Sequence, residues 1–272
     1  LVGSEMCIRD RLLTVAGLTG CFLFTSCRSA QETTARYEIS KVEGNMITID
    51  STWDANPDKK ATTVLKPYKD KVDAMMYEVI GTSEMKMDKG TPESLLSNLV
   101  ASVLQEAAAQ VLGKPADMGL VNMGGLRNIL PKGDITVGAV FEILPFENSL
   151  CVLTMKGTDM KRLFKAIASL HGEGVSGIRL EINKKGELLN ATIGGKPVVD
   201  DQLYTVATID YLADGNGRMD AFLQAEKREC PEDATLRGLF LDYVRKQTAE
   251  GKIITSKLDG RITVKLSLIH IS

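Results

Sequence analysis

Two short segments combine residue types that suit a ligand with a flat ring at one end and an anionic group at the other. The first reads NMGGLRN, in which Gly124 and Gly125 form a tight bend that carries Arg127. The second reads LPFEN, in which a proline stiffens the backbone beside Phe146, and Asn148 follows. A guanidinium presents a planar fork to phosphate oxygens, and an aromatic ring stacks on a heterocycle. The two segments are therefore compatible with a grip on the opposite ends of one such ligand.

The same residues also have an ordinary structural interpretation. Phe146 would then pack in the core, and Arg127 would form a surface ion pair with Asp134. The two glycines would form only a turn, and Asn148 would cap a turn through its side chain. Taken alone, the residue types leave both interpretations open.

Apolar periodicity indicates the elements that must position these segments. Helices are expected over 61–80, from Thr91-Pro92-Glu93 to a closing Gly113, from a capping Thr158 to residue 170, and over 233–247. Strands are expected at 116–122, 150–155, 204–209 and 260–264, with hairpins over 37–50 and 178–193. Because strands and helices mix without a strict βαβ rhythm, the predicted fold class is α+β with a mixed sheet.

Composition and charge are those of an ordinary globular protein. The chain is 44% hydrophobic and 25% charged, with a net charge of −2. This balance gives no basic surface, so nucleic acid is not an expected partner. Among the five cysteines, only Cys151 and Cys230 lie outside the first 27 residues. A disulfide and two buried thiols are both open for this pair.

The two ends of the chain require separate interpretation. Residues 5–11 and 266–272 can be back-translated into reverse-complementary strings, so we expect 1–11 and 266–272 to be a sequencing-adapter artefact. The apolar run over 12–24 is too short to span a bilayer and is typical of a signal peptide. We expect 12–27 to be a lipoprotein signal with Cys27 as the lipidated residue; Cys21 and a buried N-terminal helix are the alternatives. The lipid would anchor the protein to a membrane on its periplasmic or cell-surface face.

Three blocks of sequence resemble one known family in the same order. The blocks are 92–104, 122–164 and 203–217, the last reading LYTVATIDYLADGNG. They are similar to the C-terminal, substrate-binding domain of the bacterial 5′-nucleotidase, UDP-sugar hydrolase and apyrase family. The resemblance covers 85–265 and leaves 28–84 as an N-terminal extension. It implies an α+β fold of mixed sheets layered with helices in the order α/β/β/α.

The resemblance also implies roles for particular residues. Phe146 and Tyr211 would sandwich the base, Asn148 would bond to it, and Arg127 on the Gly124–Gly125 bend would face the phosphate. Two positions depart from the family pattern. The acid that contacts the sugar hydroxyls is replaced by Gly217, for which Asp214 or Asn216 would have to substitute. Two further arginines of the family have only Lys86 and Lys89 in the corresponding region.

The catalytic half of this family is a metallophosphoesterase domain whose two metals are held largely by histidines. This sequence has two histidines, His270 in the terminal artefact and His171 at a helix end, where a cap role is the simplest interpretation. We therefore expect no cofactor in this chain and divalent metals on a separate metallophosphoesterase chain. The chain would then be the nucleotide-binding subunit of a split 5′-nucleotidase, inactive alone. A stand-alone nucleoside- or nucleotide-binding lipoprotein and a degenerate structural domain are the alternatives.

Overall fold

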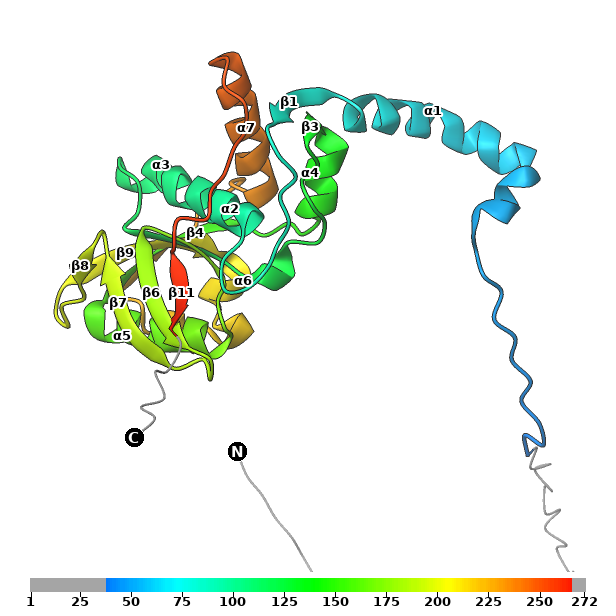
Figure 1. The fold of residues 1–272 in the computed structure, drawn as a ribbon. Helices are drawn as coiled ribbons and strands as arrows, with labels where there is room; N and C mark the ends of the chain where they lie inside the picture. The colour runs from blue at the N-terminus through cyan, green and yellow to red at the C-terminus, as the bar shows by residue number, and fades with distance from the viewer. Residues whose placement is uncertain (1–37, 266–272) are drawn as a thin grey trace, which may run out of the picture. The chain divides into compact units, whose positions relative to one another are not determined.

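The computed structural model describes residues 38–265 of the chain, which divide into two units between Asn56 and Pro57 (Figure 1). The predicted signal, Cys27 and the two predicted artefacts lie outside the described residues. In the first unit, residues 38–49 are exposed and form no strand, so the predicted hairpin over 37–50 is wrong there. A two-stranded hairpin needs further packing to be stable, and nothing covers these residues. Within residues 38–56 one short helix forms, η1 (Ser51–Ala55), which the Asp50 side chain caps.

The second unit begins with a long exposed helix, α1 (Lys59–Met76), capped by the Asp58 side chain. The predicted helix over 61–80 is confirmed for most of its length. It ends early because Val79 and Ile80 enter strand β1 (Val79–Ser83), which pairs with β3 (Gly133–Thr136) in an antiparallel ribbon. This ribbon joins part of the predicted extension to the rest of the unit.

A five-stranded mixed sheet carries the first of the two segments that the sequence singles out. Its order is β10 (Lys227–Glu229), β4 (Leu150–Lys156), β9 (Leu203–Ile209), β2 (Met118–Val121), β5 (Gly174–Ser176). The β2–β9 pair is parallel and the other pairs are antiparallel. Because β2 lies between β9 and β5 and ends at Val121, the glycine bend follows directly from an interior strand of the sheet.

Helix α2 (Leu95–Ala107) packs against β2 and β5, and the short α3 (Ala109–Leu112) follows it. Residues 95–112 are apolar enough for a membrane span, but half of them are buried in the fold, as in a core helix. The predicted cap at Thr91 is wrong: Thr91-Pro92 is a cis peptide outside the helix, and the Ser94 side chain accepts from the Ser97 N–H instead. Gly113, at a φ of 70°, ends α3 as predicted.

A second mixed sheet of four strands has the order β11 (Ile262–Lys265), β6 (Ile178–Asn183), β7 (Leu188–Ile193), β8 (Lys196–Pro197). Helix α5 (Gly157–Ser169) contacts strands of both sheets. Its cap position is Lys156 rather than the predicted Thr158. Helix α7 (Leu236–Ala249), capped by Thr235, packs on α2 and β1. The predicted α+β class with mixed sheets and layered helices is confirmed.

Five short helices and one disulfide complete the second unit. The helices are η2 (Met123–Gly125), α4 (Val137–Ile143), α6 (Asp210–Ala213), η3 (Asn216–Arg218) and η4 (Asp220–Gln224). Cys151 on β4 is bonded to Cys230 just beyond β10, so the predicted alternative of two free thiols is wrong. The bond joins strands that already pair, which brings the two sulfurs together.

Candidate functional site

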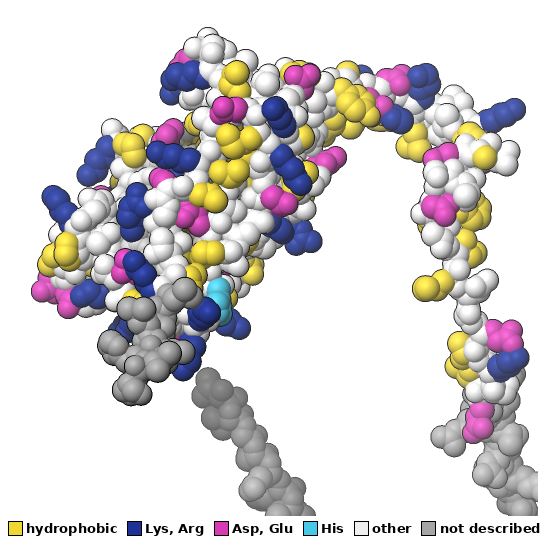
Figure 2. All heavy atoms as spheres, in the orientation of Figure 1, with side chains coloured by type: hydrophobic (Ala, Val, Ile, Leu, Met, Phe, Trp, Pro, Cys, Tyr) yellow, Lys and Arg dark blue, Asp and Glu magenta, His cyan; other side chains and the backbone are white. Residues whose placement is uncertain are grey.

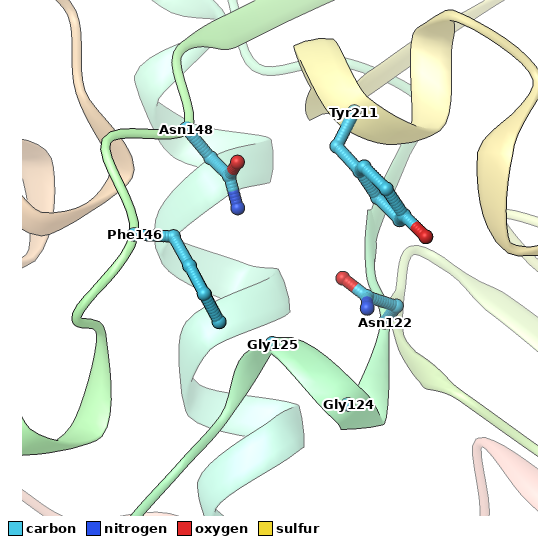
Figure 3. Close-up of a pocket in the computed structure, with 6 residues that line it drawn as sticks. All are labelled: Asn122, Gly124, Gly125, Phe146, Asn148 and Tyr211. Carbon is cyan, nitrogen blue, oxygen red and sulfur yellow. The ribbon is translucent and has the colours of Figure 1, made fainter. Parts of the chain in front are cut away.

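A cavity of about 340 Å³ opens where the glycine bend, the segment after α4 and helix α6 meet. Its lining residues are Asn122, Gly124, Gly125, Phe146, Asn148 and Tyr211 (Figure 3). The structure thus brings together five of the six predicted ligand-binding residues, from three separate stretches of chain. The volume lies within the range of small-molecule pockets.

The two aromatic rings stand on opposite sides of the cavity (Figure 3). The exposed fractions are 47% for Phe146 and 45% for Tyr211, whereas Phe164, Phe222 and Phe240 are at most 2% exposed. The alternative of Phe146 as a core residue is therefore wrong. Two facing, half-exposed rings can enclose a planar group and stack on both of its faces.

Arg127, the sixth predicted residue, lies beside this cavity rather than in its lining. Its guanidinium carbon is 5.9 Å from the centroid of the Phe146 ring, and Nη1 donates to the Gly124 carbonyl at 3.4 Å. Its backbone N–H donates to the Ile143 carbonyl at 2.9 Å, which ties the bend to the end of α4. Within residues 38–265 it forms no ion pair, so the predicted alternative with Asp134 is not formed.

Lys89 brings a second cation to the bend, because its Nζ donates to the Leu126 carbonyl. The neighbouring Lys86 is exposed. The lysine therefore adds positive charge next to Arg127 without a planar fork.

The Phe146 segment is held by Arg237, a residue that the sequence analysis did not single out. Arg237 is 8% exposed, donates through Nη1 to the Leu144 carbonyl at 3.1 Å, and pairs with Glu147. Its guanidinium carbon also lies 4.1 Å from the centroid of the Phe141 ring. The signal available in the sequence was an arginine in the first turn of the last predicted helix, after Leu236 and three residues before Phe240.

Asn122 was also missed as a lining residue. Its amide points toward the space between the two rings (Figure 3), and Oδ1 is buried without a hydrogen-bond partner among the described residues. A Cβ at Gly125 would lie 3.0 Å from this oxygen, so a glycine is needed for close approach. A buried acceptor without a donor is costly unless a ligand supplies the donor.

Glu173, directly before β5, lies behind the bend and is 9% exposed. Its Oε2 accepts a hydrogen bond from the backbone N–H of Met123. Burial raises the pKa of this carboxyl to about 7, and the Met123 hydrogen bond only partly offsets that effect. No local pattern marked Glu173, since it reaches the bend only through the pairing of β5 with β2.

The second loop brings Tyr211 to the cavity but no acidic group. Gly217 has a φ of 65°, and a Cβ there would lie 3.8 Å from the Tyr211 ring. Asp214 accepts from Arg228 at 2.7 Å, and neither Asp214 nor Asn216 lines the cavity. The sugar hydroxyls of a nucleotide would therefore find no carboxylate among the lining residues.

The described residues do not fit a two-metal centre. Within residues 38–265 no group of three His, Cys, Asp or Glu side chains is placed to hold a metal ion. His171 lies at the C-terminal end of α5 with a φ of 61°, and its N–H donates to the Ala168 carbonyl. Both sulfurs of Cys151 and Cys230 are in the disulfide, so neither is a free thiol nucleophile.

Comparison with known proteins identifies the family of this chain. The sequence profile of the 5′-nucleotidase C-terminal domain matches residues 79–224, more than half of the chain. The chain belongs to this family. The match includes the glycine bend, the Phe146 segment and the Tyr211 loop.

Similar proteins are considerably longer than this chain. It is 28% identical to the endonuclease YhcR of Bacillus subtilis, over 66% of this chain and 15% of YhcR. It is 27% identical to the cell wall protein Lmo0130 of Listeria monocytogenes, over 79% of this chain and 30% of that protein. A 5′-nucleotidase precursor from Thermus thermophilus matches with a TM-score of 0.64 and 26% identity, over 78% of this chain and 44% of its own. The chain thus spans less than half of each of these proteins.

Proposed function

We propose that this chain is the nucleotide-binding subunit of a split 5′-nucleotidase, acting in nucleotide hydrolysis and catabolism with a separate metallophosphoesterase chain. The observation that carries the proposal is the cavity itself. Phe146 and Tyr211 face each other across it, Arg127 stands beside it, and the described residues offer no metal centre. The metals that activate water would come from the partner chain.

The geometry suggests how a nucleotide would lie. Its base would stack between Phe146 and Tyr211, with the amides of Asn148 and Asn122 available to its polar edge. Its phosphate would point toward Arg127 and the neighbouring lysine, where a metal-bearing partner would have access to it. Stacking tolerates every base, so Asn148 and Asn122 are the groups available for discrimination.

Helix α1 supports the existence of a partner chain. Along it lies an apolar stripe, Val64, Leu65, Tyr68, Val72 and Met75, whose members are 50–70% exposed (Figure 2). Folded chains seldom leave such a contiguous apolar face in water. The matched relatives have additional sequence outside the aligned region, so the proposed occupant of the stripe is the metallophosphoesterase chain.

The disulfide and the relatives support a location outside the cytoplasm. A disulfide such as Cys151–Cys230 persists in oxidising compartments. One relative is described as a cell wall protein. A lipid at Cys27 would keep the chain on the periplasmic or cell-surface face of a membrane, and mass spectrometry of the detergent-extracted protein would detect the acyl groups.

Calorimetric titration with AMP, followed by a phosphate-release assay in Mn²⁺, tests the proposal. We expect AMP to bind to the chain alone without hydrolysis. Hydrolysis should appear when a metallophosphoesterase domain without a substrate-binding domain of its own is added. Phe146→Ala should abolish the stimulation, whereas Tyr77→Ala, an exposed aromatic outside the cavity lining, should not. Phosphate release by the chain alone would falsify the proposal that binding and catalysis lie on separate chains. Absence of AMP binding would exclude the proposed nucleotide-binding role.

A stand-alone nucleotide-binding lipoprotein is the second candidate. The completeness of the cavity favours it, since this chain supplies both rings and both amides. Under this alternative AMP would bind with the same affinity whether or not a metallophosphoesterase domain is present, and the two chains would not co-elute in size-exclusion chromatography.

A further inference from the structure

The carboxyl group of Glu173 is a feature that nucleotide binding alone does not explain. It is buried behind the glycine bend and is absent from the cavity lining. Its Oε2 accepts the N–H of Met123, the residue between Asn122 and Gly124. Those two neighbours both line the cavity. One buried carboxyl thus holds the backbone between two ligand-facing positions.

The strand pairing keeps Glu173 in this place. Val121 at the end of β2 pairs with Gly174 at the start of β5, so Glu173 is opposite Asn122. At Gly174 a Cβ would lie 2.7 Å from a Val121 methyl and 3.0 Å from Ser97. The backbone at this point is therefore packed closely on both sides, which fixes the position of the Glu173 main chain.

No cation compensates the carboxylate. The charged or titratable side chains on the elements around it are Arg127 on the bend, Lys89 and Glu93 before α2, and His171 in its own turn. Lys89 is bonded to the Leu126 carbonyl, Glu93 accepts from the backbone of Asp259 and Arg261, and none of these groups contributes to the raised pKa of Glu173. Among the residues that the structure describes, only the Met123 N–H favours its ionised form.

We infer that Glu173 is a positioning residue whose charge state sets the affinity of the cavity, through the hydrogen bond that it accepts from Met123. The inference rests on the proposed nucleotide-binding function. A hydrogen bond to a carboxylate is roughly twice as strong as one to a neutral carboxyl. Ionised Glu173 therefore holds Asn122 and the two glycines in their ligand-facing positions, and the protonated form holds them less firmly. Because the pKa is about 7, the change falls between pH 6 and pH 8.

Two measurements on the mature chain test this inference. The probe ligand is adenosine, whose charge does not change between pH 6 and pH 8. We expect adenosine to bind about five-fold more weakly at pH 6 than at pH 8. Without ligand, the amide resonance of Met123 in a ¹H–¹⁵N spectrum should titrate with a midpoint near pH 7.

Substitutions assign the effect to one group. Glu173→Gln keeps an acceptor for Met123 and removes the titration, so both the affinity and the Met123 resonance should become independent of pH. Glu187→Gln, an exposed carboxyl outside the cavity lining, should leave both profiles unchanged. His171→Asn, which tolerates the positive φ at this position, should also leave them unchanged.

The outcomes separate this inference from the function on which it rests. If adenosine binds equally at both pH values, or more tightly at pH 6, the role of Glu173 is overturned. The proposed nucleotide-binding function is not affected by that result. A pH profile that moves in His171→Asn but persists in Glu173→Gln also overturns it. Failure of adenosine to bind at any pH overturns the proposed function itself, and this inference falls with it. The Met123 titration in the unaltered chain requires no variant to fold.

Discussion

The two walls of the cavity are secured in different ways. The first wall, which carries Phe146 and the glycine bend, is held by buried contacts to α4, α7 and β5, among them Arg237 and Glu173. The second wall, which carries Tyr211, is anchored by the buried Leu212 and Ala213 of α6. Its polar contacts are a backbone bond from Asp210 to Ser149 and a partly exposed Asp214–Arg228 pair. The disulfide fastens the strand that bears Arg228.

Both walls reach the core, and they differ in whether the polar contacts that hold them are buried or exposed. Removing one partner of a buried polar contact leaves the other unsatisfied, whereas an exposed ion pair contributes little. The second loop also has Gly215, Gly217 and Arg218 at positive φ, a backbone that departs from regular structure. We therefore expect the first wall to be preformed. We expect the conformation of the second wall to depend on the Cys151–Cys230 disulfide.

The largest expected effect comes from removing the disulfide between Cys151 and Cys230. Replacing both cysteines, Cys151→Ala with Cys230→Ala, should lower the free energy of unfolding by about 4 kcal/mol, because the bond closes a long loop. The sequence separation of the two cysteines is 79 residues. Urea unfolding followed by circular dichroism measures the change, and reduction of the unaltered chain is the matched control. An unchanged midpoint in both samples would show that the strand pairing alone secures the second wall.

The next effect concerns the buried carboxyl of the first wall. Its folded pKa of about 7 is above the ordinary value of 4.5, so the folded state binds the proton more tightly than the unfolded chain. The stability that this provides is fully present below pH 4.5 and is lost as the pH rises through 7, a change of about 3 kcal/mol. Urea unfolding at pH 5 and pH 8 should show this difference between the unaltered chain and Glu173→Gln. Identical pH dependence in the two proteins would contradict it.

The two rings offer the most direct comparison of the walls. Phe146→Ala should weaken adenosine binding by roughly 1–3 kcal/mol, about 5- to 150-fold. Tyr211→Ala should cost somewhat less, since only Phe146 also contacts the Arg127 guanidinium. Calorimetry with adenosine measures both, and Tyr77→Ala serves as the control for a lost exposed ring. A larger loss of adenosine affinity for Tyr211→Ala than for Phe146→Ala would contradict this order.

The smallest effect should distinguish charge from geometry at Arg127. Arg127→Lys keeps the charge and removes the planar fork, so AMP should bind about five-fold more weakly while adenosine changes little. Lys86→Ala, at an exposed lysine, is the control and should leave both ligands unaffected. An equal loss for AMP and adenosine would mean that Arg127 acts through Phe146 rather than on phosphate.

Local patterns predicted the elements that they encode directly. The strand at β9, the hairpin of β6 and β7, and the Gly113 stop follow from apolar alternation and turn residues. Helix starts were misplaced where two capping candidates stood close together, as with Thr91 and Ser94. Helix α2 begins at Leu95, three residues after Pro92, so Ser94 rather than Thr91 is in the cap position.

The sequence by itself determined the α+β class, the glycine bend, and the residue types that meet a ligand. Only the tertiary structure decided that Phe146 faces solvent, that Glu173 lies behind Met123, and that the two cysteines bond. The physical reason is the range of the interactions. Turns and amphipathic faces depend on neighbours a few residues apart, whereas these contacts join segments that only strand pairing and core packing bring together.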